Sequence, residues 1–121
     1  MTTSELQAAV RERDGVALID LTGDVNSSAE AALKEAYAQA TASGAGSVAL
    51  NFERADYINS TGIALIVGLL AQARTNGVEM KAFGLSDHYR EIFEITRLAD
   101  FMTIADNEER AVSDAERSND A

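Results

Sequence analysis

The chain has 121 residues, a length that predicts one domain over residues 1–121 with a single hydrophobic core. Its 20 acidic and 10 basic residues give a net charge of −10, which disfavours nucleic acids and anionic membranes as partners and favours a basic protein surface. The absence of cysteine excludes disulfides and thiolate metal sites, and no signal-peptide pattern or run of about 18 apolar residues occurs, so we expect a cytoplasmic protein without membrane insertion.

The first elements that the sequence predicts are two strands of a hairpin. Residues 6–11 alternate between apolar and polar side chains, as an edge strand does, and the Asp-Gly pair at 14–15 is a turn signal. Residues 16–21 form an aliphatic run that is typical of a buried strand. The Thr-Gly pair at 22–23 is expected to end this strand, and residues 24–26 to form a short loop.

Helices and apolar strands alternate in the rest of the chain. Further strands are expected at residues 47–57, 78–83 and 101–104. The first helix is expected to start at Ser27, whose spacing to Glu30 matches a capping box, and later helices at residues 59–61, at Ser86 and at Asp106. Residues 116–121 are expected to be frayed. The order β-β-α-β-α-β-α-β-α predicts an α/β sandwich, in which a mostly parallel sheet of about four or five strands packs with about four helices.

Residues 56–70, with the sequence DYINSTGIALIVGLL, join a strand to an apolar helix and form the expected functional region. Asn59, Ser60 and Thr61 are all residue types that cap a helix N-terminus, so one of them should accept a hydrogen bond from the backbone there. The remaining hydroxyl then faces solvent. Gly62 permits a tight turn or the close approach of another molecule.

The helix after Gly62 has more apolar residues than one face needs. The core stripe is expected to consist of Ile63, Ile66, Val67 and Leu70. Leu65 and Leu69 lie off this stripe, so either the helix is buried almost all round or these two residues face a partner. Gly68 costs a helix about 0.5 to 1 kcal/mol relative to alanine, which we expect close helix packing to offset.

Other kinds of site have little support. His88, the only histidine, falls in an expected surface helix, and the pair Glu108-Glu109 is typical of a solvated face. The glycines at 44 and 46 lack the rest of a dinucleotide fingerprint. Ser60 follows a strand, as a hydrolase nucleophile does, but no GxSxG motif or base accompanies it. We therefore expect no enzyme activity, no cofactor and no metal site.

A hydroxyl at the start of a helix can instead accept a phosphate. Phosphorylation adds about −1.5 to −2 charges, which a helix N-terminus tolerates but a partner surface fitted to a bare hydroxyl does not. Ser60 and Thr61 can equally be mere capping residues, and their spacing leaves both interpretations open.

The stretch at 56–70, LTGDVN at 21–26 and IFEITRLADFMTIADNEERAV at 92–112 resemble the STAS domain, and within it the bacterial anti-sigma factor antagonists. The similarity runs from about Val16 to Val112. Its best motif is an acidic or amide residue, then Ser, Ser or Thr, Gly and a small apolar residue, which residues 59–63 match.

This resemblance implies a phosphorylation-controlled binding protein. The unphosphorylated antagonist of the family binds an anti-sigma factor that is also an ATP-dependent serine kinase, and so frees the sigma factor. The kinase then phosphorylates a serine that aligns with Ser60, and a metal-dependent serine phosphatase restores the bare form. Thr61 is the second candidate for the phosphate. The expected partner-binding residues are Asp24, Asn26, Asn59, Ser60, Thr61, Gly62, Leu65 and Leu69.

The chain departs from the family at three positions, and two other interpretations remain open. Asn26 and Asn59 stand where the family often has acidic residues, and Arg97 stands where it often has a helix-ending glycine. One alternative is a STAS subunit of a larger assembly, such as a stress-signalling complex or the cytoplasmic part of a lipid transporter. The other is an enzyme or a small-ligand binder.

Overall fold

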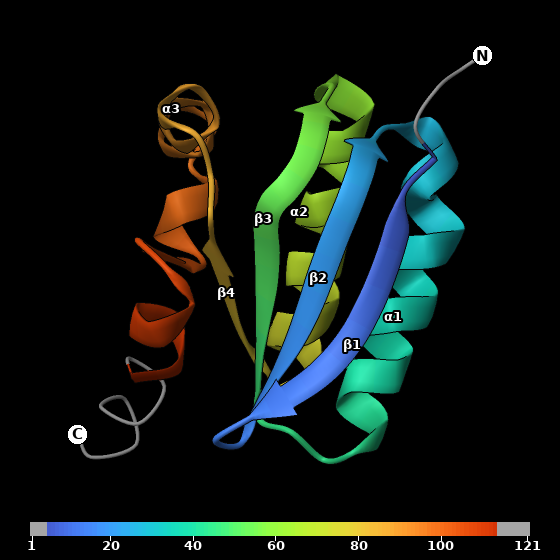
Figure 1. Cartoon of the computed structure of the whole chain (residues 1–121), viewed down its shortest axis with the longest axis vertical. Helices are drawn as coiled ribbons and strands as arrows, with labels where there is room; N and C mark the ends of the chain where they lie inside the picture. The colour runs from blue at the N-terminus through green and yellow to red at the C-terminus, as the bar shows by residue number, and fades with distance from the viewer. Residues whose placement is uncertain (1–4, 114–121) are drawn as a thin grey trace.

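The computed structural model describes residues 5–113, which form a five-stranded sheet with helices packed on it (Figure 1). The strands are β1 (Gln7–Arg13), β2 (Val16–Val25), β3 (Ser47–Ile58), β4 (Glu79–Phe83) and β5 (Thr103–Ala105). They lie in the order β1-β2-β3-β4-β5, with β1 antiparallel to β2 and every other neighbouring pair parallel. The predicted fold class is therefore confirmed.

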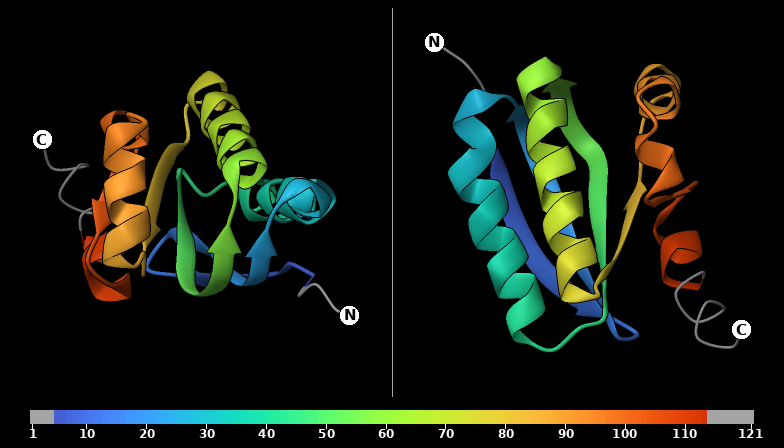
Figure 2. Two further views of the ribbon diagram at one scale, coloured as in Figure 1. Left: turned by 90° about the horizontal axis from the view of Figure 1, so that it is seen from above. Right: turned by 180° about the vertical axis from the view of Figure 1, so that it is seen from behind.

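The helices follow the strands in the predicted order. They are α1 (Glu30–Ala42), α2 (Ser60–Asn76), α3 (Asp87–Ile95) and a terminal helix that begins at residue 108, with short 3-10 turns at Ser27–Ala29 and Leu98–Asp100. Helices α1 and α2 lie side by side on one face of the sheet, and α3 lies beside β4 (Figure 2). The residues expected to be frayed, 116–121, lie outside the described part of the chain.

Alternating side chains on the strands divide the core between the two faces of the sheet. Ile19 and Leu50 belong to the larger cluster beneath α1 and α2, whereas Leu18 and Ala49 belong to a smaller cluster with Val112 of the terminal helix. The terminal helix thus covers part of the face opposite α1 and α2, and the rest of that face is open.

The strand β2 is longer than the sequence predicts. It does not end at Thr22 and Gly23 but continues to Val25, through register shifts against β3 on either side of these two residues. Gly23 has a φ of 107°, which a residue with a side chain rarely adopts, and so it absorbs the irregularity within the strand. The predicted loop at 24–26 is therefore wrong, because Val25 still pairs with Ile58 of β3.

At two expected helix starts, a neighbour of the expected residue is the cap: one caps the 3-10 turn before α1 and the other caps the terminal helix. The helix α1 itself begins at Glu30, after Ala29, and has no side-chain cap. Asn26, rather than Ser27, accepts a hydrogen bond from the backbone N–H two residues further on, and Asn107, rather than Asp106, accepts one from the N–H three residues on. Asp106 forms an ion pair with Arg90 instead. The sequence offers two capping residue types side by side in both places, so only the path of the turn decides between them.

The buried stripe of α2 is rotated from the predicted one. Its fully buried side chains include Ile66, Leu69 and Leu70, whereas Val67 is 46 % exposed. Gly68 is exposed, and no atom lies within 4 Å of the place where a Cβ would stand, so the close packing predicted at Gly68 is wrong. Several stripes in this apolar helix have helical spacing, and packing against the sheet selects the one through Leu69.

An ion-pair network ties the terminal helix to the open face of the sheet. Arg11 binds Asp20 at 2.7 Å and also binds Glu108, and Arg13 binds Glu108 at 2.8 Å. The hydrogen bonds from Arg11, only partly opposed by burial, lower the pKa of Glu108 to about 2. The solvated role predicted for Glu108 is therefore wrong, because its carboxylate joins β1 to the terminal helix.

We predict that Glu108→Gln weakens the protein most at neutral pH. A carboxylate with a lowered pKa stabilises the folded state above its ordinary pKa of 4.5, and this contribution is lost as the pH falls towards 2. Urea unfolding from pH 7 to pH 2.5 should show the gap in unfolding free energy between wild type and Glu108→Gln closing below about pH 4.5. The matched control is Glu109→Gln at an exposed glutamate, and a gap that stays constant with pH would contradict the assignment.

Candidate functional site

The carboxyl ends of β2 and β3 bring the predicted site together. Val25 and Ile58 pair across the two strands, and the backbone N–H of Asn59 donates to the carbonyl oxygen of Val25 at 3.2 Å. The loop that follows β2 therefore lies against the junction between β3 and α2. Asp24 and Asn26 are brought beside residues 59–62, although they are more than 30 positions away in the sequence.

Asn59 is the residue that caps α2. Its side-chain oxygen accepts a hydrogen bond from the backbone N–H of Gly62 at 2.8 Å, and its carbonyl oxygen accepts one from Ile63 at 2.9 Å. Ser60 and Thr61 are consequently not needed as caps. Both are exposed, and neither hydroxyl forms a hydrogen bond within residues 5–113, so two hydroxyls stand free at the start of the helix.

Gly62 serves the fold at this junction. It is buried, and a Cβ at this position would lie 2.0 Å from the carbonyl oxygen of Val25. The close approach that the glycine allows is thus made by the end of β2 and not by a separate molecule. Gly62 fixes how near α2 starts to the end of β2, and it thereby sets the position of Ser60.

Of the two leucines expected in the partner surface, only Leu65 is partly accessible. Leu69 is only 4 % exposed and belongs to the core, and Leu65 is half-buried. The exposed face of α2 instead carries small and uncharged side chains, which are Ala64, Val67, Gly68, Ala71 and Gln72. The predicted core stripe did not identify this face, because α2 is apolar on several sides and its sequence pattern does not show which side faces the sheet.

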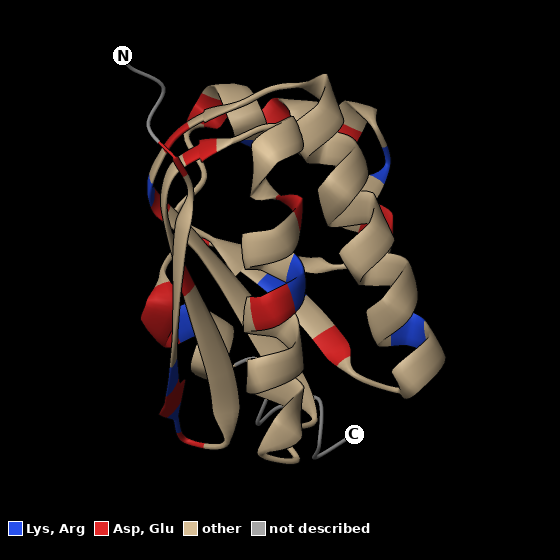
Figure 3. Cartoon of the chain, turned by 90° about the vertical axis from the view of Figure 1, so that its right-hand side faces the viewer, with Lys and Arg blue, Asp and Glu red and all other residues tan. Residues whose placement is uncertain are grey.

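This exposed face is nearly without charge. Arg74 is the one charged residue of α2, whereas α1 carries Glu30, Lys34 and Glu35 (Figure 3). The guanidinium of Arg74 lies 5.0 Å from the ring centre of Phe101, in a cation–π contact. In a chain with a net charge of −10, an exposed helix face with no carboxylate is a local exception.

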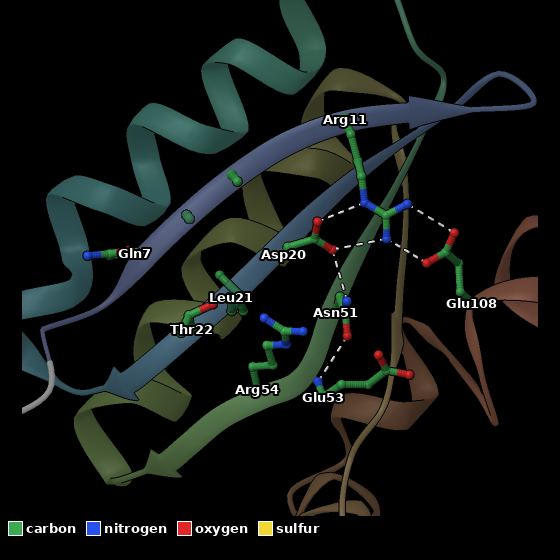
Figure 4. A pocket seen from close by; sticks show the side chains of 11 residues that line it. Gln7, Arg11, Asp20, Leu21, Thr22, Asn51, Glu53, Arg54 and Glu108 are labelled. Atoms are coloured by element: carbon green, nitrogen blue, oxygen red, sulfur yellow. Dashed lines mark hydrogen bonds and ion pairs between the residues drawn. The ribbon is translucent and has the colours of Figure 1, made fainter.

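A hollow lies on the open face of the sheet, on the side away from α2 (Figure 4). Its volume is about 610 Å³, and three of its charged residues, Arg11, Asp20 and Glu108, bind one another. Asp20 also accepts a hydrogen bond from Asn51 at 2.9 Å. These hydrogen bonds outweigh partial burial and lower the pKa of Asp20. The polar groups of this hollow therefore brace strands β1 to β3.

Residues 5–113 contain no group of three or more His, Asp and Glu residues placed to hold a metal ion, and none of their helices has the length and apolar character to cross a bilayer. His88 is exposed at the start of α3, as expected, with its ring 5.0 Å from that of Tyr89.

Known proteins resemble this chain in sequence and in fold. The STAS domain family model matches residues 7–111. An anti-sigma-B factor antagonist of Staphylococcus aureus is 38 % identical over 60 residues, which are 50 % of this chain and 56 % of that protein. BtrV of Bordetella bronchiseptica, provisionally named an anti-sigma factor antagonist, is 31 % identical over 83 % of this chain and 86 % of its own length.

A solved structure has the same fold. The Bacillus cell fate determinant SpoIIAA, solved in its phosphorylated form, superposes with a TM-score of 0.66 at 22 % identity, covering 91 % of this chain and 98 % of that one. At this identity the likeness shows the fold. The chain belongs to the STAS domain family, and the resemblance of its sequence to that family is confirmed.

We predict that Gly62→Ala destabilises the protein by roughly 3 kcal/mol, because the added methyl forces β2 and α2 apart. Guanidinium unfolding followed by circular dichroism measures this loss. Gly46→Ala is the matched control, because nothing lies within 4 Å of its Cβ position, and it should stay within about 0.5 kcal/mol of wild type. Equal stability of the two variants would show that the junction tolerates a side chain.

Proposed function

We propose that this protein is an anti-sigma factor antagonist whose binding is switched off by phosphorylation of Ser60. The observation that carries the proposal is the exposed Ser60 hydroxyl, which stands without a hydrogen bond at the start of an uncharged helix face. The names of the relatives from S. aureus and B. bronchiseptica support the antagonist role. The phosphorylated SpoIIAA structure supports the kind of switch.

The geometry suits a switch that acts on the partner and not on the fold. A phosphate on Ser60 would sit where the backbone N–H groups and dipole of α2 favour an anion, so the domain should stay folded. The same phosphate would place about two negative charges at the edge of a neutral docking face. A partner fitted to the bare hydroxyl would lose water around the phosphate without gaining a counter-charge, and it would dissociate.

Two asparagines take the places at which the family often has acids. The side-chain oxygen of Asn26 accepts a hydrogen bond from the backbone N–H of Ser28, and the side-chain oxygen of Asn59 accepts one from the backbone N–H of Gly62. Both positions keep the capping function without adding charge beside Ser60. Asp24 then remains as the half-buried carboxylate of the β2 end, available to a basic group of the partner.

The proposed partner is an anti-sigma factor that is also a serine kinase, and a metal-dependent serine phosphatase would return Ser60 to its bare form. The proposed contact surface contains Asp24, Asn26, Thr61, the exposed part of Leu65 and the exposed face of α2. The protein would act in the cytoplasm by binding and not by catalysis. Thr61, also exposed, is the alternative acceptor of the phosphate.

We predict opposite effects for two substitutions at Ser60. Ser60→Ala should bind the kinase in the presence or absence of Mg-ATP, because it cannot be phosphorylated. Ser60→Glu should bind at least about tenfold more weakly, since a like charge or an uncompensated carboxylate at an interface costs more than 1.4 kcal/mol. The measurement is calorimetric titration of the purified anti-sigma factor kinases of the source organism, one at a time, with mass spectrometry of the modified residue.

Thr61→Ala distinguishes the two acceptors: its response to ATP should stay intact if Ser60 takes the phosphate and should be lost if Thr61 takes it. Equal affinity of wild type, Ser60→Ala and Ser60→Glu would contradict the proposed switch. Co-purification at fixed stoichiometry with a scaffold or transporter ATPase, unaffected by phosphorylation, would instead favour a subunit of a larger assembly.

A further inference from the structure

A groove of about 310 Å³ lies between α1 and α2. Its apolar lining comes from Leu33 of α1 and from Leu65 and Leu69 of α2, and Gly68 forms part of its α2 side. We propose that this groove receives an uncharged apolar side chain of the protein that docks over Ser60, and that Gly68 is kept small for this contact. This inference rests on the proposed function, because it assumes the same partner.

The inference rests on Gly68, because nothing within the described chain explains why a glycine stands at this position. Gly68 stands in the interior of α2 without a positive φ, so neither a turn nor a strained backbone requires it. It is exposed, and a Cβ there would meet no atom within 4 Å. Glycine weakens a helix relative to alanine, and here no packing within the chain offsets that cost. The open space beside it therefore suits atoms from another molecule.

The charges around the groove define the occupant. Glu30 and Lys34 are the charged residues of its lining, and they bind each other at 3.1 Å. A charged side chain entering the groove would thus lose hydration without gaining a counter-ion. An aliphatic or aromatic side chain meets the leucines at no such cost.

The groove is continuous with the phosphoacceptor end of α2. Ala64, which also lines it, stands one helical turn after Ser60, and Gly68 stands one turn further, roughly 12 Å along the helix axis from Ser60. A standard interface covers about 800 Å² on each partner, so one docked protein can reach both places. The apolar side chain in the groove would then supply affinity, and the Ser60 hydroxyl at the edge of the interface would control whether the partner binds.

The test compares two substitutions at Gly68. Gly68→Ala should raise the melting temperature of the isolated protein by about 2 to 4 °C, because it strengthens an exposed helix position. Gly68→Leu should keep the fold, since leucine is a good helix former, but it should fill the groove and weaken binding of the purified anti-sigma factor kinase by about tenfold or more. Circular dichroism checks the fold, and calorimetry measures the affinity.

Gln39→Leu is the matched control, because it adds the same side chain at an exposed position of α1 outside the groove and should leave affinity unchanged. A lower melting temperature for Gly68→Ala would show that the chain itself needs the glycine, and it would overturn the inference. If Gly68→Leu binds the kinase with wild-type affinity and Ser60→Glu binds it weakly, the result would contradict the proposed role of the groove and would still support the switch at Ser60. If Gly68→Leu binds the kinase weakly and Ser60→Glu binds it as the wild type does, the result would support the groove as a binding site and contradict the phosphorylation switch. If no anti-sigma factor kinase binds the wild-type chain, both proposals fail.

Discussion

The contact between the carbonyl of Val25 and the backbone at the start of α2 determines where everything at the candidate site lies. This carbonyl accepts the N–H of Asn59 and stands so close to Gly62 that no side chain fits between them. The last residue of one strand and the first turn of a helix are thereby held as one unit. Ser60 lies in this first turn, between the two residues that contact Val25, and it is exposed.

Much of this junction could be predicted from the sequence because its determinants are local. A run of capping residue types followed by glycine and an apolar stretch specifies a helix start, whatever the rest of the chain does. Arg97 is another local case: the family resemblance predicts a helix-ending glycine at this position, and its φ of 69° shows that the backbone adopts the left-handed conformation with a larger residue. The parallel pairing of β2 with β3 and of β3 with β4 likewise follows from the helices that connect these strands.

The parts that sequence could not specify depend on which segments meet. Leu69 and Val67 are equally apolar, and only the contact of α2 with the sheet decides that the first is buried and the second exposed. In the sequence alone Glu108 resembles a solvated surface residue. Its ion pairs with Arg11 and Arg13 form only because the terminal helix packs beside β1. The extension of β2 past Gly23 also depends on β3 being alongside to supply hydrogen bonds.

The distribution of charge gives the site its sensitivity. On most of this acidic surface, two further negative charges would change the local field only moderately, since carboxylates are already present. The exposed face of α2 is different, because it carries one arginine near its end and no acid. A phosphate at Ser60 would reverse the sign of that face, and it would do so at the end of the helix that best tolerates an anion. A large change in what a partner meets can therefore coexist with a small change in the stability of the fold, and a reversible binding switch needs that combination.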